Sequence, residues 1–435
     1  DDADADIVPL LGALVRQSLV LREDGADDGP RFRLLETIRS FAATRLRAQP
    51  YWDLAAGAQA AAMQRAVAAA GLAVRDTGFD ARLRRLELEL PNLRLALDWL
   101  QARDPAGSLG LLDALGSFWA LCGYGAEGLA RCEVVLAGYP ARDLRRCRVV
   151  RLAAWIATNL GEFSRADAHL AEASGLADFL ADSREQAYVA FVRGNVAQGQ
   201  GRLAEAEAHL NRALRAFTEL AEPWVVFATQ AALAMVALEH GDAALAETRY
   251  VAALRLAGPD GAPRDRAAVL CNIAVAQRWQ GKSAEAVTHA ARALALTEDT
   301  VAWSARAGAL QVLARVALRE GDLVAARGWM AVGLRYWQRS GDQWGLATSL
   351  EGVAAIAAAD GDAVRAAALL GAVAALRERL AAPASAYGAA ERAELEAALR
   401  EALGTIDVAV ATERGRGMPL VAALDLARTL LAVPA

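Results

Sequence analysis

A glycine recurs every forty residues through the middle of the chain, and this spacing limits the folds that the chain can adopt. The six glycines are Gly161, Gly201, Gly241, Gly281, Gly321 and Gly361. A small residue precedes each glycine by seven positions, and an alanine follows each by five. Apolar residues recur at intervals of three and four on both sides, which is typical of amphipathic helices. Each copy is therefore predicted to be a pair of antiparallel helices that turns at the glycine.

The residues around the glycine fit such a turn. Glycine readily adopts the left-handed conformation that closes many helices. Acidic residues directly after it, such as Asp242 and Asp322, suit the start of the second helix because they can cap it and interact favourably with its dipole. The copies resemble tetratricopeptide repeats, whose unit is about 34 residues, so the forty-residue period predicts a longer connection between copies. An earlier copy is expected to turn at Gly123.

Stacking of the copies follows from their size. One helix pair cannot bury its own apolar face, so neighbouring pairs must pack together into a solenoid with an extended concave surface. The predicted fold is all-α, a tetratricopeptide-like superhelix. Its expected parts are a partial winged-helix domain over residues 1–49, a helical bridge over 50–105, the repeats over 106–380 and C-terminal capping helices over 381–435.

Composition narrows the functional classes. The 435 residues carry a net charge of −5, which argues against direct contact with nucleic acid because such binding rests on neutralising phosphates. No apolar run approaches the ~20 residues of a membrane span. The four cysteines show neither CxxC pairs nor zinc-like spacing, so we expect buried thiols in a cytoplasmic protein without a bound metal.

The N-terminal segment follows a different pattern from the repeats. A helical pattern begins near Val8, and two short extended segments at 19–22 and 31–35 flank a polar, glycine-rich hairpin tip. A second helix is predicted from about Glu36 to Leu46. The order of helix, two-stranded wing and helix is that of the end of a winged-helix domain.

Three motifs resemble one family. The segment RFRLLETIRSFAATRLRA (31–48) looks like the winged helix that follows the nucleotide-binding module in bacterial STAND-class regulatory ATPases, including LuxR-type and SARP-type transcriptional regulators. The segment LELELPNLRLALDW (86–99) is similar to their bridging helix. The segments LLGAVAALRERLAAP (369–383) and ERGRGMPLVAALDLA (413–427) resemble the part that closes their repeat array.

This resemblance implies a sensor region. In such regulators the array senses an effector and restrains an ATPase switch that controls transcription. A nucleotide-binding module that takes ATP or ADP is then expected upstream of Asp1, with no cofactor in these residues themselves. The chain is not expected to be an enzyme, because paired carboxylates, a nucleophile elbow and a phosphate loop are not found. The alternative is a free-standing tetratricopeptide scaffold for protein–protein interaction.

A candidate binding surface follows from the repeat register. In such superhelices the first helix of each pair lines the concave side, with inward positions two, three, six, ten and thirteen residues before the glycine. Polar and aromatic residues there suggest recognition of a small molecule, peptide or protein, and arginine beside tryptophan suits an anionic or planar group. An ordinary solvent-filled groove is the alternative. The predicted residues are Arg148, Arg151, Trp155, Asn159, Tyr188, Asn195, Gln198, Arg278, Trp279, Gln311, Arg315, Arg319 and Glu351.

Two other motifs have simpler explanations. Gly281-Lys282-Ser283 spells the end of a phosphate-binding loop, but Ala276 replaces the first glycine of that motif. The triplet lies at a repeat turn, where Ser283 is predicted to cap the second helix. Histidines recur eight residues after three of the repeat glycines, yet neighbouring repeats would hold them too far apart to share a metal ion.

Overall fold

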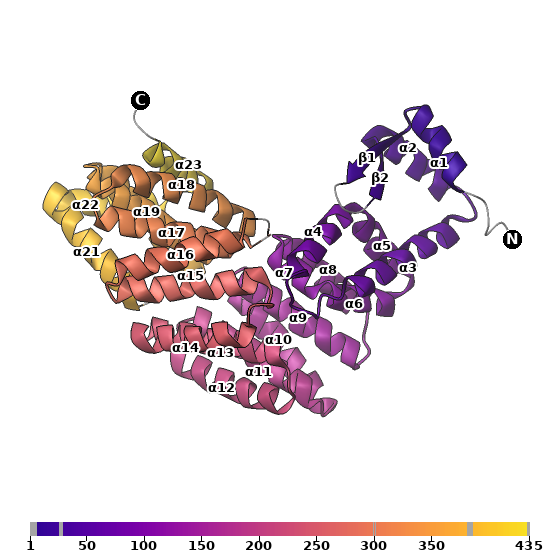
Figure 1. Cartoon of the computed structure of the whole chain (residues 1–435), viewed down its shortest axis with the longest axis horizontal. Helices are drawn as coiled ribbons and strands as arrows, with labels where there is room; N and C mark the ends of the chain where they lie inside the picture. Colours follow the sequence, from indigo (N-terminus) through magenta and orange to yellow (C-terminus); the bar gives the residue numbers. More distant parts are fainter. Residues whose placement is uncertain (1–6, 26–28, 299, 301, 381–385, 433–435) are drawn as a thin grey trace. The chain divides into compact units, whose positions relative to one another are not determined.

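The computed structural model describes residues 7–25, 29–298, 300, 302–380 and 386–432. Its internal contacts divide the chain into two compact units, residues 1–63 and 64–435. Helices α1 to α23 and the two strands of one small sheet form the regular structure of the described residues (Figure 1).

The first unit has the predicted order of helix, hairpin and helix. Its elements are α1 (Ile7–Arg16), β1 (Val20–Gly25), β2 (Gly29–Leu34), α2 (Glu36–Arg47) and the first part of α3 (Trp52–Ala70). The strands pair antiparallel from Val20 opposite Leu34 to Gly25 opposite Gly29, so each extends further toward the hairpin tip than predicted. The predicted tip spans residues 23–30; its ends belong to the strands, and its middle, residues 26–28, lies outside the described residues. Val20 is buried in this unit, whereas Ile7 and Val8 are exposed.

Five helices precede the regular repeats in the second unit: α4 (Phe79–Leu88), α5 (Leu90–Arg103), α6 (Pro105–Ala114), α7 (Gly116–Leu121) and α8 (Gly125–Ala137). The predicted turn at Gly123 is present, with a φ of +84°. The expected first helix of this copy is divided into α6 and α7. A Cβ at Gly116 would lie 3.0 Å from a methyl carbon of Leu152, so this start of α7 packs closely on α9.

Six regular helix pairs follow. They are α9 (Leu144–Asn159) with α10 (Phe163–Phe179), α11 (Ser183–Gly199) with α12 (Leu203–Glu219), α13 (Pro223–Glu239) with α14 (Ala243–Ala257), α15 (Pro263–Trp279) with α16 (Ser283–Leu296), α17 (Trp303–Arg319) with α18 (Leu323–Ser340), and α19 (Gln343–Ala359) with α20 (Ala363–Arg379). Each repeat glycine lies in the turn between the two helices of a pair, as predicted. The helical-repeat solenoid is therefore confirmed.

The left-handed glycine is present in all six turns and the acidic cap in three of them, while the predicted cap at Glu162 makes no side-chain bond. All six glycines have φ between +74° and +92°, the left-handed conformation that disfavours a side chain. Asp242, Asp322 and Asp362 each accept a hydrogen bond from the backbone N–H three residues later and so cap the second helix. The predicted cap at Ser283 is wrong, because α16 begins at Ser283 itself and Lys282 occupies the cap position without a side-chain bond.

Three of the five connections between copies are only two or three residues long, which corrects the expectation of a longer linker there. Five and six residues separate α14 from α15 and α16 from α17. Residues 180–182 alone separate α10 from α11, and both helices are 17 residues long. In such copies the additional residues of the forty-residue period lengthen the helices, whereas α14 and α16, of 15 and 14 residues, precede the longer connections. Ala181 and Ala221 have φ of +51° and +52° in two of these connections, so the chain makes a left-handed turn at both ends of these repeats.

Small residues let the two helices of each pair approach closely. The alanine five positions after each glycine is fully buried, from Ala166 to Ala366. Gly194 occupies the small position before Gly201, and a Cβ there would lie 2.6 Å from Cγ of Leu210. A larger side chain at these positions would separate the helices and leave apolar surface uncovered.

The first helices of successive pairs form the inner layer of the array. They contact one another from α9 and α11 through to α17 and α19. No contact of similar extent between the second helices of neighbouring pairs is found in the described part of the chain. Closer packing on one side curves the array toward that side, so the exposed surface of the first helices is the concave surface. We call it the inner surface.

Three helices follow the last pair: α21 (Ala386–Leu403), α22 (Thr405–Arg416) and α23 (Leu420–Leu431). α22 crosses α20 at two glycines. A Cβ at Gly371 would lie 1.9 Å from the carbonyl oxygen of Thr412, and one at Gly415 would lie 1.8 Å from that of Ala368. Each glycine belongs to one of the two C-terminal motifs quoted above, so this backbone contact explains why glycine is needed in both.

A matched pair of glycines tests the turn requirement. Gly281→Ala should lower the free energy of unfolding by about 1 kcal/mol, because φ is +77° there. Gly328→Ala should raise it by about 0.5 kcal/mol, because Gly328 is exposed inside α18, where alanine forms helix more readily. Neither new methyl group would meet a neighbouring atom within 4 Å. Thermal unfolding monitored by circular dichroism measures both effects, and equal melting temperatures would contradict the left-handed requirement.

Candidate functional site

The predicted binding residues fall into two main groups on the inner surface of the second unit. Arg148, Arg151, Trp155 and Tyr188 line a cavity of about 920 Å³ beside α9 and α11. The second group contacts α21 instead and comprises Arg278, Trp279, Arg315 and Glu351. The two halves of the inner surface therefore differ in what covers them.

A buried acid lies at the centre of the cavity wall. Glu185 is 1% exposed, and its Oε2 accepts a hydrogen bond from Nε of Arg151 at 2.7 Å. Nε of Arg148 lies 3.4 Å from the other oxygen, and its Nη1 lies 3.9 Å from Asp113. Burial raises the pKa of Asp113 above its ordinary value, although Arg151 and Arg148 oppose the shift. Arg148 is about one-third exposed, so its guanidinium can reach a ligand in the cavity.

The segment of residues 71–75, which lies between α3 and α4, lines one side of the cavity. Arg75 lies over the rings of Phe79 and Trp224, with its guanidinium carbon 4.1 Å and 4.2 Å from their centroids. Its carbonyl oxygen accepts a hydrogen bond from the N–H of Ala262, and its guanidinium pairs with Asp265 at 3.5 Å. Burial lowers the pKa of Arg75 to about 10, against the effect of Asp265, so it remains a cation at neutral pH. These contacts fix the segment across the start of α15.

Aromatic groups complete the wall. Arg151 lies over the ring of Tyr188 at 4.5 Å, and the Tyr188 hydroxyl donates to Glu222 at 2.9 Å. Burial and the nearby Glu222 raise the pKa of Tyr188 to about 12, so its hydroxyl keeps its proton at neutral pH. The cavity thus joins apolar ring faces to alternating positive and negative groups, a combination that suits a peptide better than a purely apolar molecule.

The remaining predicted residues take separate positions. Asn159 and Arg319 are exposed, although the charge of Arg319 adds to those of Arg315 and Arg278 in lowering the pKa of Glu391. Asn195 donates to the Phe191 carbonyl, one turn earlier in its own helix. Gln198 donates to Glu239 at 2.8 Å, and Gln311 accepts a hydrogen bond from Trp337 of α18 at 3.3 Å. The structure gives these five residues no common site.

Several cavity residues were missed from the sequence. Glu185 and Asp265 lie sixteen positions before Gly201 and Gly281, and Trp224 lies seventeen before Gly241. The list of inward positions ends thirteen residues before the glycine. Extending it by one helical turn would have included all three residues. Arg75 lies outside the repeats, so the register gives no signal for it.

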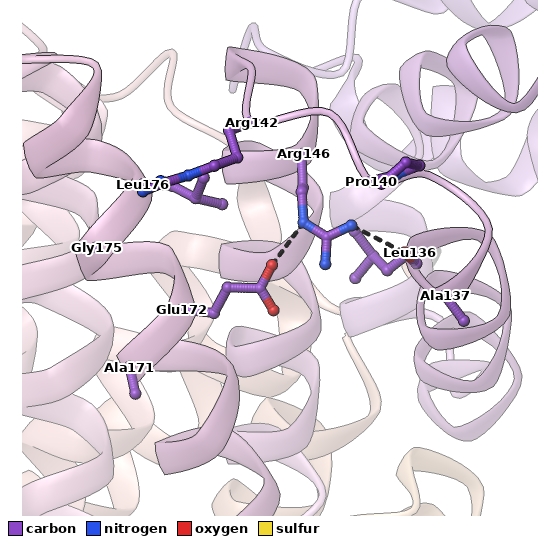
Figure 2. A pocket seen from close by; sticks show the side chains of 9 residues that line it. All are labelled: Leu136, Ala137, Pro140, Arg142, Arg146, Ala171, Glu172, Gly175 and Leu176. Atoms are coloured by element: carbon purple, nitrogen blue, oxygen red, sulfur yellow. Dashed lines mark hydrogen bonds and ion pairs between the residues drawn. The ribbon is translucent and has the colours of Figure 1, made fainter.

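A second pocket, of about 570 Å³, lies between α8 and α10. Figure 2 shows Arg146 at its centre, where Nε donates to Glu172 at 2.6 Å and Nη1 donates to the Leu136 carbonyl at 2.8 Å. Nη1 also donates to the carbonyl of Tyr139. Because these bonds use Arg146 to tie the loop before α9 to both helices, we interpret it as structural.

The described residues contain no group of three or more histidine, cysteine or acidic side chains placed to hold a metal ion. In the same part of the chain, no helix combines the length and apolar character needed to cross a membrane.

A carboxyl group on the inner surface should make stability depend on pH. Burial raises the pKa of Glu239 to about 7, although Gln198 opposes this by donating a hydrogen bond. The folded state therefore favours the neutral acid, and its stabilisation is lost as the pH rises through about 7. Glu239→Gln should be more stable than the parent chain at about pH 8, by up to about 3 kcal/mol, and equal to it at about pH 4. Thermal melts across this range measure the difference, and the exposed Glu219→Gln is the control. A constant difference at all pH values would contradict it.

Comparison with known proteins supports the fold. No protein-family model and no curated protein matches the chain. The structure of a Rap protein complexed with competence and sporulation factor is similar, with a TM-score of 0.51 and 14% identity over 80% of this chain and 99% of that one. NprR in complex with its cognate peptide NprX matches with a TM-score of 0.46 and 13% identity, over 81% and 98% of the two chains. A tetratricopeptide repeat protein from Parabacteroides merdae matches with a TM-score of 0.41 and 16% identity, over 58% of this chain and 94% of that one. At such identity the Rap match concerns the fold alone, and it confirms the tetratricopeptide-like repeat fold predicted from the sequence.

Proposed function

We propose that this chain is the sensor region of a STAND-class transcriptional regulator, and that the cavity beside α9 and α11 binds the peptide or protein effector. The observation that carries the binding role is the cavity itself, where Arg148 and Trp155 lie on one wall and the buried Glu185 keeps the arginines in place. The Rap protein, which has this fold, was solved with competence and sporulation factor bound, so the fold is compatible with such a partner.

The regulatory role rests on the order of the sequence motifs. A helix–hairpin–helix unit precedes the bridge and the repeats, as expected for the end of a winged helix in these ATPases. The position of the cavity supports a link between binding and the upstream part of the chain. Arg75 and its neighbours form one wall, and they follow α3 directly. An effector that contacts this wall would act on the segment that connects the repeats to the N-terminal unit.

A selection experiment tests the binding role. The immobilised chain should enrich members of a displayed random dodecapeptide library, and the enriched peptides should carry a carboxylate and an apolar ring. Arg148→Ala with Trp155→Ala should weaken their binding by about tenfold or more, because it removes the accessible cation and a ring face. Arg215→Ala, an exposed arginine on α12, is the matched control. Titration calorimetry measures the affinities, and equal affinity in the double variant would place the site elsewhere.

ATP turnover tests the regulatory role. The codons that precede Asp1 in the gene are expected to encode a nucleotide-binding module, and the longer protein should release phosphate from ATP. A selected peptide should change that rate in the parent protein but not in the Arg148→Ala/Trp155→Ala variant. A phosphate-release assay provides the measurement. The lack of such a module, or a rate that bound peptide leaves unchanged, would replace the sensor hypothesis with the free-standing scaffold.

A further inference from the structure

The second half of the inner surface holds a helix of the chain itself. The ring of Tyr387, in the first turn of α21, stacks on Trp279 with centroids 4.4 Å apart and planes inclined by 23°. The Tyr387 hydroxyl donates to the carbonyl oxygen of Gly241 at 2.7 Å. One aromatic side chain of α21 thus contacts the end of α15 and the turn that follows α13.

One turn later, a carboxylate of α21 meets two arginines. Glu391 pairs with Arg278 of α15, and its Oε2 lies 3.5 Å from Nη1 of Arg315 of α17. Burial alone would raise the pKa of Glu391, but the charges of Arg315 and Arg278 outweigh it and lower that pKa. Without Glu391, two arginines that are largely shielded from water would face each other without a counter-charge, so this position favours an anion.

A third contact reverses the charges. Arg392 of α21 pairs with Glu351 of α19, which is 6% exposed. The same carboxylate already accepts two hydrogen bonds from Arg377 of α20, each of 3.1 Å. Glu351 therefore has a partner within the array whether or not α21 is present.

Apolar burial contributes little to holding α21 in place. Leu399 is its one buried residue among those described, whereas α20 buries eleven. Burial of apolar surface supplies most of the stability of a docked helix. Tyr387 also packs against the core formed by α13, α14 and α15. A helix with one buried residue can nevertheless leave its site at lower cost than one that buries eleven.

The fit of α21 also leaves polar groups unsatisfied. Nε1 of Trp279 and Nε of Arg392 are buried, and neither has a hydrogen-bond acceptor among the described residues. A buried donor without an acceptor destabilises the state that holds it. A ligand that offered an acceptor to Trp279 would recover this energy, which α21 does not.

We propose that the first two turns of α21 occupy a peptide-binding site in place of an external ligand. The turn after α13 and the helices α15 and α17 form this site, whereas the helix as a whole contacts mainly α19, α20 and α22. The ligand would be a helical peptide segment that presents an aromatic side chain to Trp279 and, one turn later, a carboxylate to Arg278 and Arg315. This inference rests on the proposed function, in that it assigns a peptide partner to the same inner surface. Binding then requires α21 to leave, so the apparent affinity falls by the fraction of chains in which the site is open.

A synthetic peptide of residues 386–403 with a fluorescent label provides the probe. The full chain carrying Tyr387→Ala and Glu391→Ala should bind it at least about tenfold more tightly than the parent chain, because its own α21 no longer competes. Adding Arg278→Ala and Arg315→Ala to that variant should abolish binding. Glu394→Ala, an exposed change on the same helix, should bind the peptide as weakly as the parent does. Fluorescence anisotropy measures each affinity.

Two results would overturn the inference: equal affinity of the parent and the Tyr387→Ala/Glu391→Ala variant, or binding that persists without Arg278 and Arg315. If a variant fails to fold by circular dichroism, hydrogen exchange on the parent chain decides. Saturating peptide should speed exchange in α21 but not in α22, and unchanged exchange in α21 would also overturn it. The peptides selected from the displayed library, whose binding should depend on Arg148, test the cavity beside α9 and α11. This inference can therefore fail while the proposed function stands.

Discussion

A left-handed turn closes the first helix of every regular pair, and the positions of all side chains on the inner surface depend on it. With glycine at φ near +80°, the chain reverses within three residues, and the second helix packs against the first through fully buried alanines. Because every pair is built in this way, equivalent positions of the first helices face the same side. A change in one turn would rotate the following helix and move its side chains off the inner surface.

The local and periodic part of this arrangement could be predicted from sequence. The glycine register, the buried small residues and the aspartate caps depend on neighbours close in the chain, so their patterns repeat visibly. The lengths of the helices could not be predicted from the period. A forty-residue period is compatible with either a longer connection or longer helices, and the left-handed Ala181 and Ala221 hide the second turn from a search for glycine.

The long-range contacts could not be predicted in this way. Nothing in the period shows that Arg75 would lie between two aromatic rings at the cavity, or that Tyr387 would stack on Trp279 more than one hundred residues earlier. Such contacts depend on how far the superhelix turns between distant repeats. The two C-terminal motifs are an intermediate case, because their glycines were visible but their meeting between α20 and α22 was not.

The two halves of the inner surface share one electrostatic arrangement but differ in how firmly the fold holds its carboxylate. Glu185 and Glu391 each lie between two arginines. Glu185 belongs to α11, a helix of the array, so its carboxylate cannot leave without unfolding a repeat. Glu391 belongs to an appended helix with a single buried residue. If it leaves, Arg278 and Arg315 lose their counter-charge, and water replaces part of the cover that α21 gives them. The two neighbouring cations still repel each other in the open site, so a ligand carboxylate at the position of Glu391 would stabilise it. This asymmetry would make the second half of the surface responsive to an acidic ligand, while the first half keeps its shape.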